Sequence, residues 1–129
     1  MFRRIILVGL LAVAALGASG SPVAAKSNAL IVRGHCSGAT VWKLKLSPDS
    51  SRIEVEFQVD QNRNYRLWRV ALTDNATKVW HGSRFTRAPS GSFTVHRLIA
   101  NRAGADRIVA KATNARSGEV CRASVTAHF

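Results

Sequence analysis

The sequence predicts an all-β fold, an antiparallel immunoglobulin-like or fibronectin-like β-sandwich of about 7–8 strands with one disulfide. Short runs of alternating apolar and polar residues recur between turn-forming clusters, a pattern typical of sandwiches and small barrels. No long stretch after the N-terminal segment shows helical periodicity. Two cysteines, Cys36 and Cys121, stand near the two ends of the region that carries these runs. A small eight-stranded barrel is the alternative architecture.

The N-terminal segment has the pattern of an export signal. Arg3 and Arg4 precede the apolar stretch 5–18, and residues 23–25 are small enough for signal peptidase, so we expect a signal peptide over residues 1–25. The apolar stretch has 14 residues, fewer than the roughly 20 that a spanning helix needs. We therefore expect a secreted mature form, residues 26–129, with no membrane span and a single sandwich domain.

Export assigns the cysteines a structural role. An even pair of thiols in an oxidising compartment indicates a disulfide, so we expect Cys36 to be bonded to Cys121 as a buried clip between the first and last strands. The bond would close a loop of 85 positions. The chain-entropy model gives such a loop about 4–5 kcal/mol of stabilisation.

The clearest strand is predicted over residues 52–59, Arg-Ile-Glu-Val-Glu-Phe-Gln-Val, in which apolar and polar residues alternate without exception. Residues 41–46 alternate in the same way, and residues 47–51 have a turn composition. The sequence thus predicts a β-hairpin, with its turn centred between Asp49 and Ser50.

In that register, Lys45 lies opposite Glu54 and Lys43 lies opposite Glu56, while Leu46 faces Ile53. Oppositely charged residues directly across a strand pair contribute about 0.2–1 kcal/mol each. The two glutamates therefore have structural partners, and we do not expect them to act as an acid/base pair.

The remaining strands are less regular but occur at similar spacing. Glycine, proline, asparagine and serine fill the connections between them. The expected strands are 30–36, 65–72, 78–85, 92–99, 107–113 and 119–126, with turns at 73–76, 87–91, 101–104 and 114–118.

The mature chain is strongly basic, with 17 Lys and Arg against 7 Asp and Glu, a formal charge of +10. Such a charge favours an anionic partner such as a nucleic acid, an acidic glycan or a cell-envelope polymer. The alternative is solvated charge scattered by an arginine-rich composition. We expect Trp42 and Trp68 in the core, and Trp80 is the best candidate for an exposed platform. The candidate ligand or polyanion surface is Arg63, Arg66, Trp80, Arg84, Arg87 and Arg102.

The sequence motifs for metal binding, phosphate binding or catalysis are incomplete or absent. Residues 60–64, Asp-Gln-Asn-Arg-Asn, open like a calcium loop, but Tyr65 and Ala71 stand where the required glycine and glutamate should be. We interpret this stretch as a turn that bonds its own backbone. No nucleophile elbow or phosphate loop occurs. The four histidines, His35, His81, His96 and His128, lack metal-ligand spacing, so we expect no metal, cofactor or catalytic residue.

Four strings resemble a group of short exported proteins from high-GC Gram-positive bacteria. They are 59–64 (Val-Asp-Gln-Asn-Arg-Asn) followed by Trp68, 88–93 (Ala-Pro-Ser-Gly-Ser-Phe), 101–107 (Asn-Arg-Ala-Gly-Ala-Asp-Arg) and 117–121 (Ser-Gly-Glu-Val-Cys). The resemblance covers most of the mature chain and implies exported all-β architecture. It implies no activity.

The sequence favours a small secreted binding module, or one associated with the cell envelope, that is not an enzyme. Its expected partner is an anionic cell-envelope polymer. One alternative is a secreted factor that binds or inhibits another protein through loop 87–91. A small hydrolase is the least favoured class, because it would need histidines and carboxylates to converge in a cleft.

Overall fold

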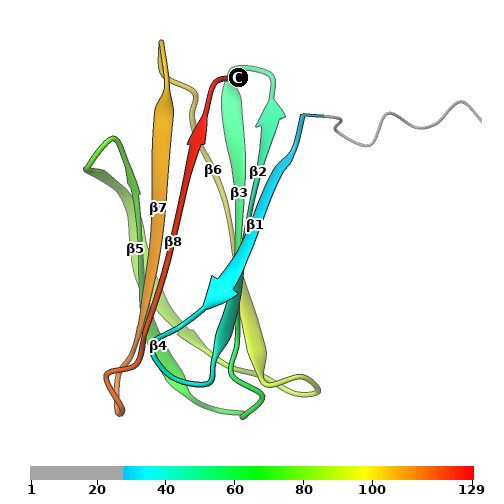
Figure 1. Cartoon of the computed structure of the whole chain (residues 1–129), viewed down its shortest axis with the longest axis vertical. Helices are drawn as coiled ribbons and strands as arrows, with labels where there is room; N and C mark the ends of the chain where they lie inside the picture. The colour runs from blue at the N-terminus through cyan, green and yellow to red at the C-terminus, as the bar shows by residue number, and fades with distance from the viewer. Residues whose placement is uncertain (1–27) are drawn as a thin grey trace, which may run out of the picture.

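A computed structural model describes residues 28–129 as two four-stranded antiparallel sheets that pack face to face (Figure 1). The predicted all-β sandwich is confirmed, and the layers form no closed barrel. Sheet A has the order β1-β2-β3-β6 and sheet B has the order β5-β4-β7-β8. The strands are β1 (Leu30–His35), β2 (Val41–Asp49), β3 (Arg52–Asp60), β4 (Leu67–Asp74), β5 (Thr77–Phe85), β6 (Ser92–Ala100), β7 (Asp106–Asn114) and β8 (Val120–Ala127).

The expected signal peptide, residues 1–25, lies outside the described residues. Within residues 28–129 no helix is long and apolar enough to cross a membrane. The described strands share one core between the two sheets.

The core forms because each strand alternates in phase with the pleat of its sheet. Phe57 and Leu44 of sheet A and Leu72 and Trp68 of sheet B are fully buried between the layers. The Trp68 ring packs near that of Phe93 with centroids 6.4 Å apart, and the Trp68 indole N–H donates to Gln61 Oε1 at 3.0 Å. Trp68 is therefore a core residue, as predicted.

The hairpin between β2 and β3 differs from the prediction by two residues. Leu46 lies opposite Val55 rather than Ile53, and Lys45 lies opposite Glu56. The strands extend to Asp49 and Arg52, which leaves a two-residue turn. A shift of two positions keeps every side chain on its predicted face, so alternation alone could not detect it.

Strand β5 contains an irregularity that the sequence did not reveal. Its register with β4 shifts between Leu72 and Thr73, so that Trp80 lies opposite Leu72 and Lys78 lies opposite Thr73. This bulge at Val79 allows two successive residues, Val79 and Trp80, to pack against the core. Trp80 is thus partly buried and is not the exposed platform that was expected.

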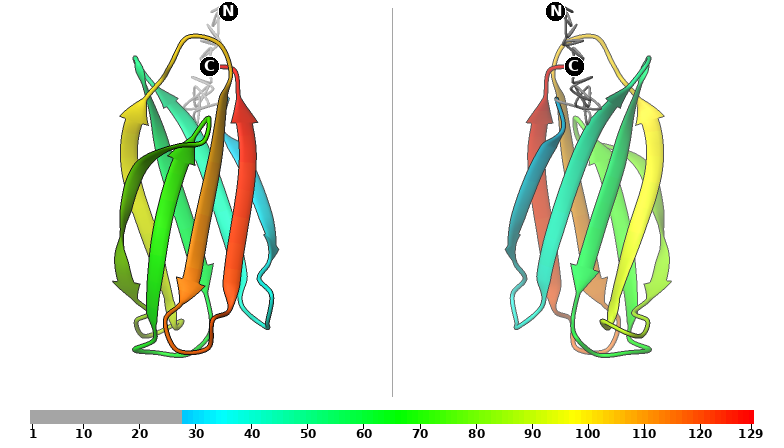
Figure 2. Two further views of the ribbon diagram at one scale, coloured as in Figure 1. Left: turned by 90° about the vertical axis from the view of Figure 1, so that its left-hand side faces the viewer. Right: turned by 90° about the vertical axis from the view of Figure 1, so that its right-hand side faces the viewer.

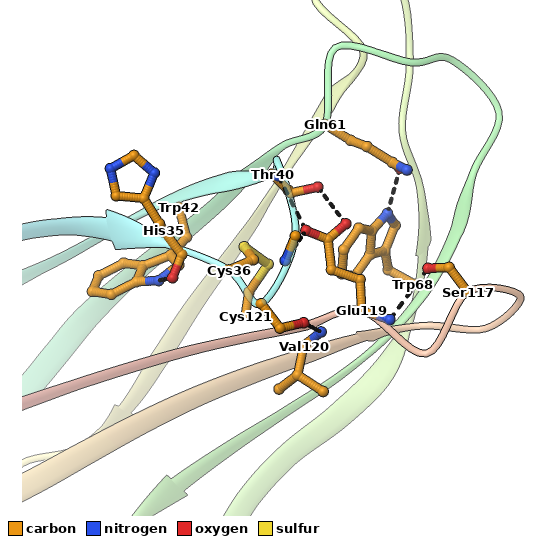
Figure 3. Close-up of a disulfide and its surroundings, with 12 residues drawn as sticks. His35, Cys36, Thr40, Trp42, Gln61, Trp68, Ser117, Glu119, Val120 and Cys121 are labelled. Atoms are coloured by element: carbon orange, nitrogen blue, oxygen red, sulfur yellow. Dashed lines mark hydrogen bonds between the residues drawn. A yellow bond between two sulfur atoms is a disulfide. The ribbon is translucent and has the colours of Figure 1, made fainter.

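The disulfide between Cys36 and Cys121 is present, with Cα atoms 4.2 Å apart (Figure 3). Cys36 follows β1 directly and is partly buried, whereas Cys121 lies in β8 and is fully buried. The predicted bond between the first and last strands is present, although Cys36 lies just beyond β1 and is only partly buried. Strands β1 and β8 are the outermost strands of their sheets on this side. Alongside it, Ser37 N–H donates to Val120 O at 2.8 Å and Val120 N–H donates to Ser37 Oγ at 2.9 Å.

The same side of the sandwich is held by Glu119. Its carboxylate accepts hydrogen bonds from Gly38 N–H at 2.9 Å, Thr40 N–H at 3.1 Å and Thr40 Oγ1 at 2.7 Å. Figure 3 shows the Glu119 carboxylate turned toward Thr40 beside the disulfide. Glu119 is therefore committed to the connection between β1 and β2 and is not available to a ligand.

Candidate anion-binding surfaces

The outer face of sheet B is turned toward the viewer in the left panel of Figure 2. The buried residues of β4 are Trp68, Val70, Leu72 and Asp74, so the intervening side chains point outward. The same alternation holds for β7 and β8. The basic residues that lie on this face are exposed: Arg69, Lys78, His81, Arg107, Lys111 and Arg122.

Pairing between strands brings these cations together. Lys111 of β7 lies directly opposite Arg122 of β8, and Ala71 of β4 separates Lys111 from His81 of β5. Neighbouring strands are about 4.8 Å apart, so the four residues form one row across the sheet. Like charges directly opposite each other destabilise a sheet. The Lys111–Arg122 pair is therefore an unfavourable arrangement for the free protein.

No carboxylate offsets this charge on the outer face of sheet B within residues 28–129. Asp74 and Asp106 of this sheet are fully buried. Glu119 lies between β7 and β8 and bonds to Gly38 and Thr40. The other four acidic residues, Asp49, Glu54, Glu56 and Asp60, belong to strands of sheet A.

The surface between the cations is hollowed. One hollow of about 350 Å³ is lined by Arg69, His81 and Lys111 among others. A second of about 300 Å³ is lined by Arg107, Lys111 and Arg122 among others. Ala71 and Lys111 line both hollows, so the two are neighbours over β4 and β7, and we call them together the concave strip. Its shape and charge suit an extended anionic chain.

Sheet A, which faces the viewer in the right panel of Figure 2, has a balanced outer face. It also has an opposed pair of cations, Arg33 and Lys43. Here, however, carboxylates lie on the neighbouring strand: Lys45 Nζ is 4.0 Å from Glu56 Oε2. The two faces of one sandwich thus differ in charge, because four acidic residues belong to strands of sheet A whereas the two in strands of sheet B are buried.

Three of the residues singled out from the sequence meet at the disulfide end of the sandwich. Arg63 and Arg66 lie in the connection between β3 and β4, and Arg87 lies in that between β5 and β6. Because they lie in two neighbouring connections, we call these three residues the basic loop pair. All are exposed.

Backbone hydrogen bonds hold the two connections together. Tyr65 N–H donates to Thr86 O at 2.8 Å, and Thr86 N–H donates to Arg66 O at 2.9 Å. Thr86 is fully buried, and its hydroxyl donates to Arg63 O at 2.5 Å. Asn62 N–H bonds Asp60 Oδ1 at 3.0 Å, so the stretch 60–64 forms the self-bonded turn that was predicted.

Arg84 and Trp80 lie on β5, at the open side of the sandwich between β5 and β6. The Arg84 guanidinium carbon lies 5.0 Å from the Trp80 ring centroid, and that of Arg97 on β6 lies 5.6 Å from it. Both distances are within the range of cation–π attraction. Arg84 and Arg87 also line one hollow of about 540 Å³ together with Ser92. Arg84 thus extends the basic loop pair along this side.

Arg102 is separate from the other candidates. It lies in the connection between β6 and β7, at the opposite end of β4 from Arg66. Its guanidinium Nε is 3.9 Å from the Asp74 Oδ2. Because Arg102 is close to a buried carboxylate, its charge is partly neutralised, and it does not join the other candidate residues.

Sequence reasoning missed the row on sheet B. The outward phase of Lys111 and Arg122 follows from alternation, which is readable in the sequence. Their adjacency follows only from the pairing of β7 with β8 and of β7 with β4. The chain matches no known protein-family model and no curated protein, so the candidate surfaces rest on geometry and charge.

Proposed function

We propose that this protein is a secreted, non-catalytic binding module that attaches to an anionic cell-envelope polymer through the outer face of sheet B. The observation that carries this proposal is the face itself, where Lys111 and Arg122 are directly opposed and no described carboxylate lies beside them. The disulfide is consistent with an extracellular location.

In the unbound protein, the opposed cations of sheet B repel each other. Cations on adjacent strands lie closer together than the Debye length of about 8 Å at physiological ionic strength, so their repulsion is only partly screened. A polymer that carries regularly spaced phosphates or carboxylates removes this repulsion and releases its own counterions. Both effects favour the bound state without a deep pocket.

The concave strip adds a geometric reason to place the polymer along β4 and β7. Ala71 has a small side chain between the longer ones of Arg69 and Lys111, so a chain lying there can approach the sheet while basic side chains contact it on both sides. The basic loop pair lies beyond one end of these strands and could contact the same polymer.

The test compares two double variants of equal charge. Lys111→Gln with Arg122→Gln removes the opposed pair on sheet B, and Arg33→Gln with Lys43→Gln removes the opposed pair on sheet A. Each lowers the net charge by two. We expect the sheet B variant to elute from heparin and teichoic acid resins at lower salt than the wild-type protein, and the sheet A variant to elute close to the wild type.

Equal shifts for the two variants would mean that net charge alone governs retention, and the proposed face would be wrong. A triple variant, Arg63→Gln, Arg66→Gln and Arg87→Gln, tests whether the basic loop pair binds the polymer instead. If it abolishes retention while the sheet B variant does not, the basic loop pair is the binding surface. A wild-type protein that passes through both resins at low salt would exclude a polyanion partner.

A further inference from the structure

Three side chains capable of binding a metal converge on the outer face of sheet A. Glu54 and Glu56 are two residues apart on β3 and therefore share one face. His96 on β6 lies directly opposite Glu56. One ligand atom from each residue lies within 4.8 Å of the other two. The cluster is on the sheet opposite to the proposed polymer-binding face.

The separations within this cluster suit a tetrahedral ion. Zinc binds imidazole nitrogen and carboxylate oxygen at about 2.0–2.2 Å, which places neighbouring tetrahedral ligands about 3.3–3.5 Å apart. His96 Nε2 is hydrogen-bonded to Glu54 Oε1 at 3.0 Å and lies 3.7 Å from Glu56 Oε1. These two distances lie on either side of the required one, and the ligand atoms of the two glutamates lie within 4.8 Å of each other, so side-chain rotations would complete the geometry as an ion replaces the hydrogen bond.

The backbone holds the three residues in place. Strand β3 is paired on both sides, with β2 and with β6, so Glu54 and Glu56 cannot move apart without breaking the sheet. Their side chains are only 18% and 32% exposed, whereas that of His96 is 53% exposed. A site with partly buried carboxylates and an accessible imidazole is open to ions from solvent.

The ligand chemistry selects the ion. Imidazole favours zinc and its transition-metal neighbours, whereas magnesium and calcium prefer sites made of oxygen alone. Two carboxylates match the charge of a divalent cation, and Lys45, 4.0 Å from Glu56 Oε2, is a nearby competing cation. We propose that Glu54, Glu56 and His96 form a zinc-binding site whose fourth position is left to water.

Isothermal titration of zinc into the EDTA-treated protein tests this site. We expect one zinc ion per chain and a loss of affinity of more than about tenfold in His96→Ala and in Glu56→Gln, since even residues that only support metal ligands contribute 10–100-fold. His81→Ala is the matched control, because it removes an exposed histidine from the outer face of sheet B. We expect it to bind zinc like the wild type.

Two further measurements distinguish a specific zinc site from weak binding at the surface. Lys45→Met should bind zinc about fivefold more tightly, because it removes one screened positive charge near Glu56. Cobalt(II) bound to the wild-type protein should show the intense visible absorption of a tetrahedral complex. The proposal would be overturned if zinc failed to bind, if excess magnesium displaced it, or if His81→Ala and His96→Ala weakened binding equally.

Discussion

Asp74 is a buried carboxyl group whose raised pKa makes a contribution to stability that depends on pH. It ends β4 facing inward, fully buried, and within residues 28–129 neither carboxyl oxygen has a hydrogen-bond donor. Burial first, then the neighbouring Asp106 carboxyl, which can share a proton with Asp74 and repels it when both are ionised, raise the pKa of Asp74 from 3.8 to about 6, against the opposing effect of Arg102. As carboxylates Asp74 and Asp106 repel each other, whereas a proton on Asp74 lets them bond.

The raised pKa of Asp74 means that its contribution to the free energy of unfolding is larger at low pH than at neutral pH. The folded-state pKa of Asp74 lies above its unfolded value of 3.8, so the folded state binds more protons between pH 4 and 6. The contribution of Asp74 to stability is therefore highest at low pH and is lost as the pH rises through 6. Each pKa unit corresponds to about 1.4 kcal/mol, so the stability lost as the pH rises is about 3 kcal/mol.

We accordingly expect Asp74→Asn to be more stable than the wild type at pH 7 and to show a weaker pH dependence between pH 4 and 7. The Asn amide can donate to Asp106 without a charge of its own. Thermal melts of both proteins across this pH range provide the measurement. A lower melting temperature for the variant at pH 7 would mean that the attraction between Asp74 and Arg102 outweighs the cost of burial.

At the scale of the strands, the two open sides of the sandwich are closed by different chemistry. On one side the disulfide joins the end of β1 to β8. On the other, β5 and β6 are linked by their connecting loop and by the contacts of Arg84 and Arg97 with the Trp80 ring. The covalent side should therefore carry the larger share of the stability.

Replacing both Cys36 and Cys121 with Ala should lower the free energy of unfolding by about 4–5 kcal/mol, since it releases a loop of 85 residues in the unfolded chain. Urea titration followed by tryptophan fluorescence measures the loss. Retention on a heparin resin should be unchanged below the transition, because Arg122, although next to Cys121 in β8, points to the opposite face of the sheet from the bond. A folded double variant that no longer binds would give the cysteines a role beyond structure.

Gly91 positions the basic loop pair. It has a φ of +66°, and a Cβ there would lie 2.7 Å from the Asn62 carbonyl carbon and 2.9 Å from that of Arg63. Gly104 provides a matched control, because its φ is +82° but a Cβ would meet nothing within 4 Å. We expect Gly104→Ala to cost about 1 kcal/mol for backbone strain and Gly91→Ala to cost at least about 2 kcal/mol. Equal melting temperatures would contradict this close packing.

The sequence predicted the strands well because alternation is a local signal. The structure extends 41–46 to Asp49 and starts the strand predicted at 65 at Leu67, but no strand is lost. The errors concern pairing. The bulge at Val79 and the hairpin register depend on contacts with a neighbouring strand. The cluster of Glu54, Glu56 and His96 likewise depends on the pairing of β3 with β6, which are far apart in the chain.

At the scale of the whole molecule, the positive charge is unevenly divided. Each sheet presents one outer face to solvent, and the carboxylates of sheet A neutralise its cations while those of sheet B are buried or bonded. An excess of +10 spread evenly would favour weak association in any orientation. Five Lys and Arg residues without a neighbouring carboxylate on the outer face of sheet B favour one orientation on a charged polymer, with the cluster of Glu54, Glu56 and His96 on the opposite face.

This asymmetry predicts the salt dependence of binding. The slope of log affinity against log salt counts the counterions released, at about 0.9 per phosphate contact on duplex DNA and about 0.7 on a single strand. Replacing Lys111 and Arg122 with Gln should therefore make the slope on a polyphosphate-type ligand shallower by about 1–2. The variant of Arg33 and Lys43 should retain the wild-type slope, since those residues face away from the polymer. Measuring affinity between low and physiological salt tests both statements, and a slope that changed equally in the two variants would mean that the protein binds in no preferred orientation.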